Sequence, residues 1–348
     1  MADRLRVIAL TGGSTVPSAR FRVEQMMPAL RRAGVDLDWR PARVSGYPPV
    51  RRWLRPLWLP AAVLARVPDV VATHRAQVTL FSREFVSTLA TLEFVTARPR
   101  VFDVDDAIWL HKGGGFARRL ARAMDVVIAG NAYLADWFGR YCDRVEIVPT
   151  VVDTARFVPA APGGAGSRSP AVGWIGSSAN FDYLLLWQDA LLDVMTRVPD
   201  LRVRVCADRR PPLDALPPGR VDWVPWHSAA EVPFLQSLDI GLMPLADSQW
   251  ARGKCSYKML LYLACGVPAV VSPVGMNRDV LAAATVGRAA GDPGEAAAAL
   301  LELLGDDHGR AALGRAGRQL VVERYSVDVL APRLADILRQ AAGQQGGD

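Results

Sequence analysis

The chain has few of the features that mark membrane-spanning, secreted or metal-stabilised proteins. None of its apolar runs reaches the roughly 18 uncharged residues that a membrane-spanning helix needs. The amino terminus lacks the long apolar core of a secretory signal. The four cysteines form no Cys-x-x-Cys pair, which argues against a zinc site or a disulfide framework. We therefore expect a cytoplasmic protein with reduced thiols.

Lysine and histidine are also scarce. Only three lysines occur, and 38 of the 41 basic residues are arginine. The four histidines complete no recognisable Ser/His/Asp or Cys/His set. Gly12 and Gly13 lack the third glycine of a dinucleotide-binding fingerprint. The net charge of +6 suits a phosphorylated substrate, an anionic membrane surface or nucleic acid.

What the sequence does contain is an alternation of apolar strands and amphipathic helices. A length of 348 residues, 51% of them hydrophobic, is enough for about two domains. In the first half we predict strands at 5–10, 69–73, 100–104, 126–129 and 145–148, and helices at 22–33, 82–96 and 116–124. This order is typical of a doubly wound parallel sheet.

The alternation restarts after a segment rich in proline, glycine and serine. There we predict strands at 171–175, 201–206, 222–223, 240–243 and 269–271, and helices at 183–197, 231–238, 257–264, 293–304 and 327–341. The expected division is an N-terminal domain at 1–160, a linker at 161–170, a C-terminal domain at 171–325, and a helix with a tail at 326–348. Both domains are thus predicted to be α/β.

Two features of the second half point to an anion. Gly176 and Ser177 follow a predicted strand and precede a helix, where free amides attract negative charge. Lys254 and Lys258 lie on one side of a helix if 255–263 is helical, so that both ammonium groups can reach one diphosphate. The alternatives are an ordinary corner of the fold and two solvated lysines.

Three aspartates follow the strand predicted at 100–104. Asp103, Asp105 and Asp106 would lie at the carboxyl edge of the sheet, where open α/β sheets bind ligands. Carboxylates there can hold Mg²⁺ or Mn²⁺, act as a base, or accept hydrogen bonds from a sugar. Alternatively, Asp106 caps the segment that follows.

The segment 47–67 combines arginines with tryptophans and leucines. Arg51, Arg52 and Arg55 beside Trp53 and Trp58 have the composition of a surface that lies on anionic lipid. Two prolines interrupt any single long helix there. A connector with inward-facing tryptophans is the alternative.

Five segments resemble one enzyme family. Residues 147–157, with the sequence IVPTVVDTARF, are similar to the hinge-entry pattern of glycosyltransferase family 4. Residues 263–275, LACGVPAVVSPVG, resemble the family's A-x-G-x-P-V-V motif. Residues 291–293 and 313–326 resemble its closing segments, and 17–22 resembles one subgroup. The resemblance extends in order over almost the whole chain.

The resemblance implies a GT-B fold, in which two Rossmann-like domains face a cleft and the C-terminal helix crosses back. It implies a nucleoside-diphosphate sugar as donor, bound by the C-terminal domain. The acceptor would be a saccharide, a lipid-linked carrier or a small molecule, with transfer usually by retention. Neither a metal, a cofactor nor nucleic acid is expected. Contact of Arg51–Trp58 with an anionic membrane would place the protein on the inner face of that membrane.

Roles for individual residues follow from the resemblance and the local patterns together. The candidates are Asp105 and Asp106 for catalysis; Gly176, Ser177, Lys254 and Lys258 for the donor diphosphate; Gly275, Met276, Asn277 and Asp279 for the donor sugar or distal phosphate; and Arg20 and Arg22 for the acceptor. Asp105 stands where relatives carry a residue, often histidine, that reaches the donor sugar.

Two departures from the family pattern affect nucleotide recognition. The family's paired glutamates, eight positions apart, should fall at Gly253 and Leu261, and neither is acidic. The basic residue expected soon after Gly176 is also missing, and Lys254 and Lys258 are candidates to replace its charge. A non-catalytic sugar-binding or scaffold protein, and a GT-B epimerase or phosphorylase, are the rival interpretations.

Overall fold

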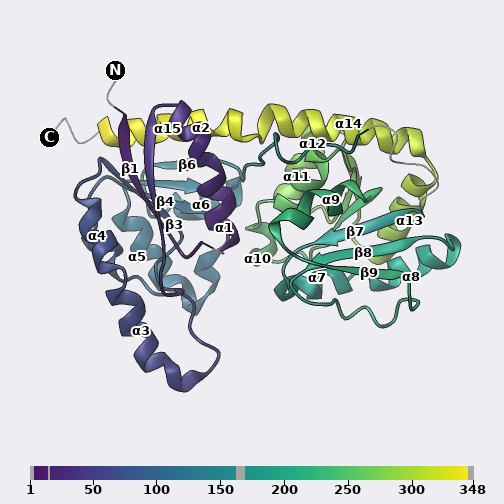
Figure 1. Ribbon diagram of the computed structural model, residues 1–348, viewed down its shortest axis with the longest axis horizontal. Coiled ribbons are helices and arrows are strands. Elements are labelled where there is room, and N and C mark those ends of the chain that lie inside the picture. The colour runs from purple at the N-terminus through teal and green to yellow at the C-terminus, as the bar shows by residue number, and fades with distance from the viewer. Residues whose placement is uncertain (1–3, 15, 162–168, 344–348) are drawn as a thin grey trace. The chain divides into compact units, whose positions relative to one another are not determined.

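The computed structural model describes residues 4–14, 16–161 and 169–343, which form two compact units. Unit 1 comprises Met1–Val151, Gly253–Cys255 and Val327–Asp348, and unit 2 comprises Val152–Arg252 and Ser256–Ser326. Most of the predicted linker, residues 162–168, lies outside the described residues. Figure 1 labels most of the helices and several of the strands.

Unit 1 is built on a six-stranded parallel sheet with the order β2-β1-β3-β4-β5-β6. Its strands are β1 (Leu5–Thr11), β2 (Val35–Pro41), β3 (Val78–Ser82), β4 (Arg100–Val104), β5 (Val126–Ala129) and β6 (Val145–Ile147). Every residue of β3, β4 and β5 is buried, as expected for strands that helices cover on both faces.

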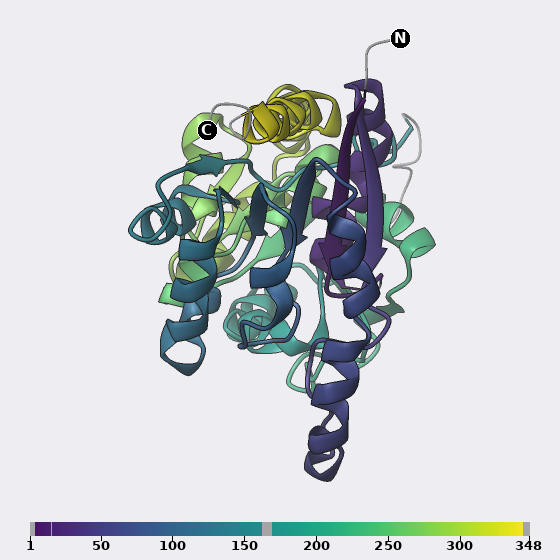
Figure 2. The ribbon, with the colours of Figure 1, turned by 90° about the vertical axis from the view of Figure 1, so that its left-hand side faces the viewer.

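The helices of unit 1 are mostly short. They are α1 (Pro17–Arg22), α2 (Met27–Arg32), α3 (Arg55–Leu64), α4 (Val67–Thr73), α5 (Gly115–Ala123), α6 (Ala132–Phe138) and α15 (Val327–Gly343), with 3-10 turns at Glu24–Met26, Arg52–Leu54, Leu92–Val95, Ile108–Leu110 and Lys112–Gly114. The last helix, α15, belongs to this unit: Leu330, Leu334 and Leu338 are buried in its core, and α15 lies against α2 (Figures 1 and 2). The C-terminal helix therefore crosses back.

Unit 2 repeats the architecture with the order β12-β11-β10-β7-β8-β9. Its strands are β7 (Ala171–Ile175), β8 (Arg202–Ala207), β9 (Val221–Pro225), β10 (Ile240–Met243), β11 (Ala269–Val271) and β12 (Gly287–Ala289). Its helices are α7 (Phe181–Leu185), α8 (Gln188–Arg197), α9 (Glu231–Gln236), α10 (Gln249–Arg252), α11 (Tyr257–Ala264), α12 (Met276–Ala283), α13 (Pro293–Leu304) and α14 (Asp307–Arg324), with 3-10 turns at Ser178–Asn180 and Ser228–Ala230. The predicted α/β fold with two parallel sheets is confirmed.

Two predicted elements of unit 1 are wrong. The strand predicted at 69–73 is helix α4, because Pro68 in its first turn already has the backbone angle of a helix. The helix predicted at 82–96 is instead the end of β3 followed by irregular chain and a 3-10 turn. Arg83 and Thr88 have positive φ angles of 70° and 65°, which no α-helix accommodates.

Two predicted helices are interrupted. In place of the helix predicted at 22–33, α1 ends at Arg22, a 3-10 turn follows, and α2 begins at Met27 with Pro28 in its first turn. The helix predicted at 183–197 breaks between α7 and α8, where Trp187 is buried in the core of unit 2. The predicted single helix is therefore two short helices, with the buried Trp187 ring between them.

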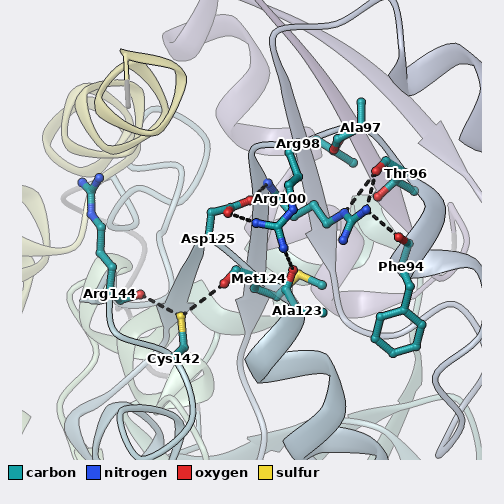
Figure 3. Close-up of polar contacts among 11 residues, drawn as sticks. Phe94, Thr96, Ala97, Arg98, Arg100, Ala123, Met124, Asp125, Cys142 and Arg144 are labelled. Atoms are coloured by element: carbon teal, nitrogen blue, oxygen red, sulfur yellow. Dashed lines mark hydrogen bonds and ion pairs between the residues drawn. The ribbon is translucent and has the colours of Figure 1, made fainter. Parts of the chain in front are cut away.

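The amino ends of β4 and β5 carry a polar cluster of their own (Figure 3). Arg98 forms an ion pair with Asp125, and the other carboxylate oxygen of Asp125 accepts a hydrogen bond from the Arg100 amide at 2.7 Å. The Arg100 guanidinium donates to the carbonyl oxygens of Phe94 and Thr96. These contacts fasten the chain before β4 at the edge opposite the one where α/β sheets bind ligands, so we assign them to stability.

Candidate functional site

Each unit contains a topological switch point, the position in a doubly wound sheet where ligands usually bind. In unit 1 the chain runs from β1 to β2 on one side and then to β3 on the other side of β1. The loops that leave the carboxyl ends of these strands border a small pocket. Its lining residues are Gly12, Val16, Ser18, Gly46, Tyr47, Ser82, Arg83, Glu84, Phe85 and Ser87.

Asp105 follows the next strand, β4, and is buried, with only 9% of its surface exposed. Its side-chain oxygen Oδ1 has no hydrogen-bond partner among the described residues. Its backbone carbonyl accepts from the Cys255 thiol at 3.3 Å, which fixes the main chain. A buried carboxylate oxygen without a partner is costly, so this atom is suited to receive a ligand's hydrogen-bond donor.

Asp103 lies two residues earlier in a different environment. Its carboxylate forms a buried ion pair with Arg22, with distances of 2.5 Å to Nη2 and 3.0 Å to Nε. Arg22 also donates to the carbonyl oxygen of Val148 at 2.8 Å. The Arg22 guanidinium is thus engaged inside unit 1, and its proposed place on the acceptor side stays a prediction. Arg20 is half-buried on α1, and its role on the acceptor side also stays a prediction.

Asp106 is held by Arg83, which sequence reasoning missed. Arg83 Nη1 lies 3.2 Å from Asp106 Oδ2. The predicted capping role of Asp106 is wrong, since the following 3-10 turn begins after Ala107 without a side-chain cap. Burial lowers the pKa of Arg83, but the carboxylates of Glu84, Asp105 and Asp106 outweigh it and raise the pKa above its usual range. Arg83 is therefore permanently charged.

Arginines engage two of the three carboxylates of the acidic cluster. Within residues 4–14, 16–161 and 169–343, no three His, Cys, Asp or Glu side chains are arranged to hold a metal ion. Asp103 is engaged by Arg22 and Asp106 by Arg83. Asp105 is the member of the cluster whose side chain has an unoccupied oxygen.

In unit 2 the switch point lies between β7 and β10. These strands pair over only two residues, Val172 and Gly173 of β7. Beyond them, the buried hydroxyl of Tyr262 accepts from the Ile175 amide and donates to the Leu242 carbonyl, both at 3.1 Å. The Tyr262 hydroxyl thus replaces the missing ladder hydrogen bonds and holds the two strand ends apart.

Gly176 and Lys258 meet at this opening. A side chain at Gly176 would lie 2.6 Å from Lys258 Cε and 2.5 Å from the Trp174 ring, so only glycine fits. Lys258, in the first turn of α11, places its ammonium 5.3 Å from the centroid of a Trp174 ring. The structure therefore brings together two of the predicted diphosphate residues, Gly176 and Lys258.

The loop that follows Gly176 differs from the expectation. The Ser178 amide and hydroxyl both donate to the Asp208 carboxylate, at 2.6 and 2.7 Å. Ser177 caps the 3-10 turn by accepting from the Ala179 amide. The two hydrogen bonds from Ser178 lower the pKa of Asp208. The amides of Ser178 and Ala179 are thus already used, which leaves the positive charge of Lys258 as the main attraction for an anion.

Lys254 does not share a helix with Lys258. Helix α11 begins at Tyr257, and Lys254 lies before it in the short stretch assigned to unit 1. The Asn131 amide donates to the Lys254 carbonyl at 3.1 Å. The argument from four-residue helical spacing is therefore wrong, because Ser256, with a φ of 51°, interrupts the backbone between the two lysines.

The positions of the expected glutamates are sterically closed. A side chain at Gly253 would lie 2.8 Å from Ala107, and Leu261 is buried in the core of unit 2. Neither site could present a carboxylate to a ligand without rearrangement. The departure from the family pattern is therefore built into the packing.

The loop before α12 is also organised by internal contacts. Gly275 has a φ of 54°, and a side chain there would lie 2.8 Å from the Arg252 carbonyl. Met276 is buried. Asn277 is fully buried. Its side-chain oxygen accepts a hydrogen bond from the Ser256 hydroxyl at 2.6 Å, and its side-chain nitrogen donates to the Ser272 carbonyl oxygen. Of the four predicted residues here, the exposed Asp279 and the Gly275 backbone are the ones available to a ligand.

A separate feature of unit 1 is the protruding segment around α3 (Figures 1 and 2). Trp53, Leu57 and Leu64 are 69%, 72% and 67% exposed. Trp58 is turned back, and its indole donates to the Ser45 carbonyl at 2.8 Å. The alternative that the tryptophans of this segment face inward thus describes Trp58, but not the exposed Trp53. No helix in the described part of the chain is long and apolar enough to span a membrane.

Comparison with solved structures defines the class of fold. The chain is similar to sucrose-phosphate synthase from Thermosynechococcus elongatus, with 14% identity, a TM-score of 0.74, and coverage of 98% of this chain and 100% of that one. It is similar to HepE from Anabaena in complex with UDP and glucose, with 12% identity, a TM-score of 0.70, and coverage of 97% and 100%. It is also similar to WaaG, a glycosyltransferase involved in lipopolysaccharide biosynthesis, with 12% identity, a TM-score of 0.67, and coverage of 96% and 99%. The fold is GT-B.

The sequence comparison adds a family match for part of the chain. Residues 169–306 match the family described as glycosyl transferases group 1. A comparison with curated proteins finds no significant match. The family match and the fold together support glycosyltransferase activity.

Proposed function

We propose that this protein is a glycosyltransferase of family 4 that transfers a sugar from a nucleoside diphosphate to a hydroxyl group, with retention of configuration. The observation that carries the proposal is the meeting of Gly176 and Lys258 at the switch point of unit 2. This position combines a close backbone approach with a fixed cation. Both are what a diphosphate requires.

Lys258 would act mainly on the leaving group. The diphosphate gains negative charge as its bond to the sugar breaks, so an ammonium group beside it stabilises the transition state more than the bound donor. The packing of the Lys258 stem against Gly176 and Trp174 holds the ammonium in place in advance. Lys254, the Gly275 backbone and Asp279 are proposed to contribute to the same donor.

Asp105 would act on the reacting sugar hydroxyls. Its partnerless Oδ1 accepts a hydrogen bond from the transferred sugar or from the acceptor nucleophile. Asp106, held by Arg83, would position the loop and contribute a second acceptor. Neither role requires a metal ion or a cofactor, and nucleic acid is not among the proposed partners.

The segment around α3 is proposed to rest on an anionic membrane, at the inner face where a lipid-linked acceptor would be presented. Arg51, Arg52 and Arg55 are exposed beside Trp53 and Leu57. Apolar side chains can enter the headgroup region while arginines pair with lipid phosphates. Saccharide and small-molecule acceptors remain compatible with this arrangement.

The proposed function can be tested with a panel of UDP-, GDP- and TDP-sugars. Release of nucleoside diphosphate, by transfer or slow hydrolysis, supports the proposal. A change in the sugar without release of the nucleotide would indicate an epimerase. If no nucleotide sugar raises the melting temperature, the glycosyltransferase proposal is wrong and a non-catalytic scaffold is favoured.

A further inference from the structure

The pocket at the switch point of unit 1 is walled by close backbone contacts. A side chain at Gly46 would lie 2.3 Å from the Phe85 carbonyl oxygen, so only glycine allows this approach. The Ser87 amide donates to the Gly46 carbonyl at 2.9 Å. Tyr47, the next residue, lines the same pocket as Glu84. The enclosed space is small and suits a group about the size of one water molecule.

Two buried polar atoms at this pocket have no partner among the described residues. They are Ser82 Oγ and Glu84 Oε2. The other oxygen of Glu84 accepts from the Thr88 amide at 3.3 Å. The Arg83 Nε atom is 3.9 Å from Glu84 Oε2, too far for a hydrogen bond. Both side chains are more than nine-tenths buried.

Electrostatic pairing leaves this region short of positive charge. Arg22 is engaged by Asp103, and Arg83 donates to Asp106. Glu84 is left without a hydrogen-bonded cation, and so is Asp105 nearby. A phosphate or carboxylate at the pocket would be repelled. Arg83, 3.9 Å from Glu84 Oε2, is shared among the carboxylates of Glu84, Asp105 and Asp106. A neutral hydroxyl would supply a hydrogen bond but would leave these carboxylates in excess over the one arginine.

An ammonium group supplies both the missing hydrogen-bond donors and the missing positive charge. It is about as large as a water molecule, donates three hydrogen bonds and carries the opposite charge. Tyr47 also lines the pocket, and aromatic rings attract cations. Resting on the proposed function, we infer that this pocket binds an amino group of the acceptor, so that the preferred acceptor is an amino sugar or a similar amine-bearing polyol.

The inference can be tested by binding alone, without donor or turnover. Methyl glucosaminide, methyl glucoside and methyl N-acetylglucosaminide differ in one substituent, which is a free amine, a hydroxyl and an amide. Calorimetric titration of the full-length protein with each should show at least tenfold tighter binding of the amine. Equal binding of the three ligands would overturn the inference.

Two variants locate the preference. Glu84→Gln keeps the side-chain shape and the Oε1 acceptor while removing the charge, and should reduce the preference for the amine at least tenfold. Asp38→Asn, an exposed carboxylate on β2, is the matched control and should leave it unchanged. Ser82→Ala, which removes one acceptor without changing charge, should weaken amine binding less than Glu84→Gln does. An unchanged preference in Glu84→Gln with a native melting temperature would contradict the assignment.

The failure of the inference is distinguishable from that of the proposed function. Nucleoside diphosphate binding is measured separately in the same Glu84→Gln protein, and should be unaffected. Amine binding without any nucleotide binding would refute the glycosyltransferase but keep the pocket. Nucleotide binding without a preference for the amine would refute the inference about the pocket but keep the glycosyltransferase.

Discussion

Two carboxylates only two residues apart show how local environment divides roles. Asp103 is at the end of β4 and is saturated by Arg22, whereas Asp105 has a buried oxygen that nothing in the described chain satisfies. Burial raises the pKa of Asp103, and Arg22 opposes this. The first aspartate therefore serves the fold, and the second is available for a ligand.

This difference predicts opposite outcomes for two matched substitutions. Asp103→Asn leaves the buried Arg22 charge unpaired, and should destabilise unit 1 by about 3–5 kcal/mol. Asp105→Asn replaces a carboxylate whose buried Oδ1 has no hydrogen-bond partner, and should leave the melting temperature unchanged or raised while lowering the transfer rate at least tenfold, about 1.4 kcal/mol. Thermal unfolding and initial rates measure both. Equal loss of stability in the two variants would refute the distinction.

Lys258 provides a second test at the residue scale. Lys258→Ala should lower kcat/KM at least tenfold, about 1.4 kcal/mol, with the fold intact, because the ammonium beside Gly176 is lost. Lys254→Ala tests the partner role proposed for that lysine in the same assay. Lys112, on the surface of unit 1, is the control: Lys112→Ala should retain the wild-type rate. Wild-type rates in Lys258→Ala would remove the diphosphate assignment.

At the scale of elements, the Tyr262 hydroxyl determines how β7 and β10 separate. It occupies the place of a ladder hydrogen bond between Ile175 and Leu242. Gly241 makes room for it, since a side chain there would lie 2.3 Å from the Tyr262 ring. One helix side chain thus shapes the strand ends on which Gly176 depends.

Removing that hydroxyl should affect stability and ligand binding together. Tyr262→Phe leaves a buried amide and a buried carbonyl without partners, which costs about 1–3 kcal/mol. Chemical denaturation should report this loss, and nucleotide affinity should fall with it. Tyr257→Phe, at the partly exposed start of the same helix, is the control. If Tyr262→Phe is as stable as the wild type, the hydroxyl is not a structural bridge.

The segment around α3 is the element whose role depends on a surface outside the protein. Replacing Trp53 and Leu57 with serine should abolish cosedimentation with vesicles that contain phosphatidylglycerol. Added salt should weaken the binding of the wild type, because arginines supply part of the attraction. Catalysis on a water-soluble acceptor should be unchanged. Equal binding to neutral and anionic vesicles would contradict the membrane proposal.

At the scale of the whole molecule, the strands that the sequence predicts well are those buried on both faces. Arg100–Val104, Val126–Ala129 and Ala171–Ile175 are continuous apolar runs, and their periodicity is unambiguous. The strand Val35–Pro41 escapes notice because it lies at an edge and alternates with charged residues. The valines at 70 and 71 suggest a strand, but the tertiary context makes them helical.

The candidate site is predictable only where it follows such strands. Asp105 and Gly176 come directly after β4 and β7, and are found for that reason. Arg83 and Glu84 follow β3 in the same way, but the segment resembles an amphipathic helix, which conceals them. The contact of Lys258 with Trp174 joins residues far apart in the sequence. Sequence spacing contains no information about such a contact.

The most direct test of the central claim is a crystal structure of the protein with the nucleoside diphosphate that raises its melting temperature most. The account predicts the diphosphate at the switch point of unit 2, with a phosphate oxygen about 3 Å from Lys258 Nζ and the chain at Gly176 alongside. A diphosphate bound elsewhere, with the Lys258 ammonium still over the Trp174 ring and touching no ligand, would contradict it.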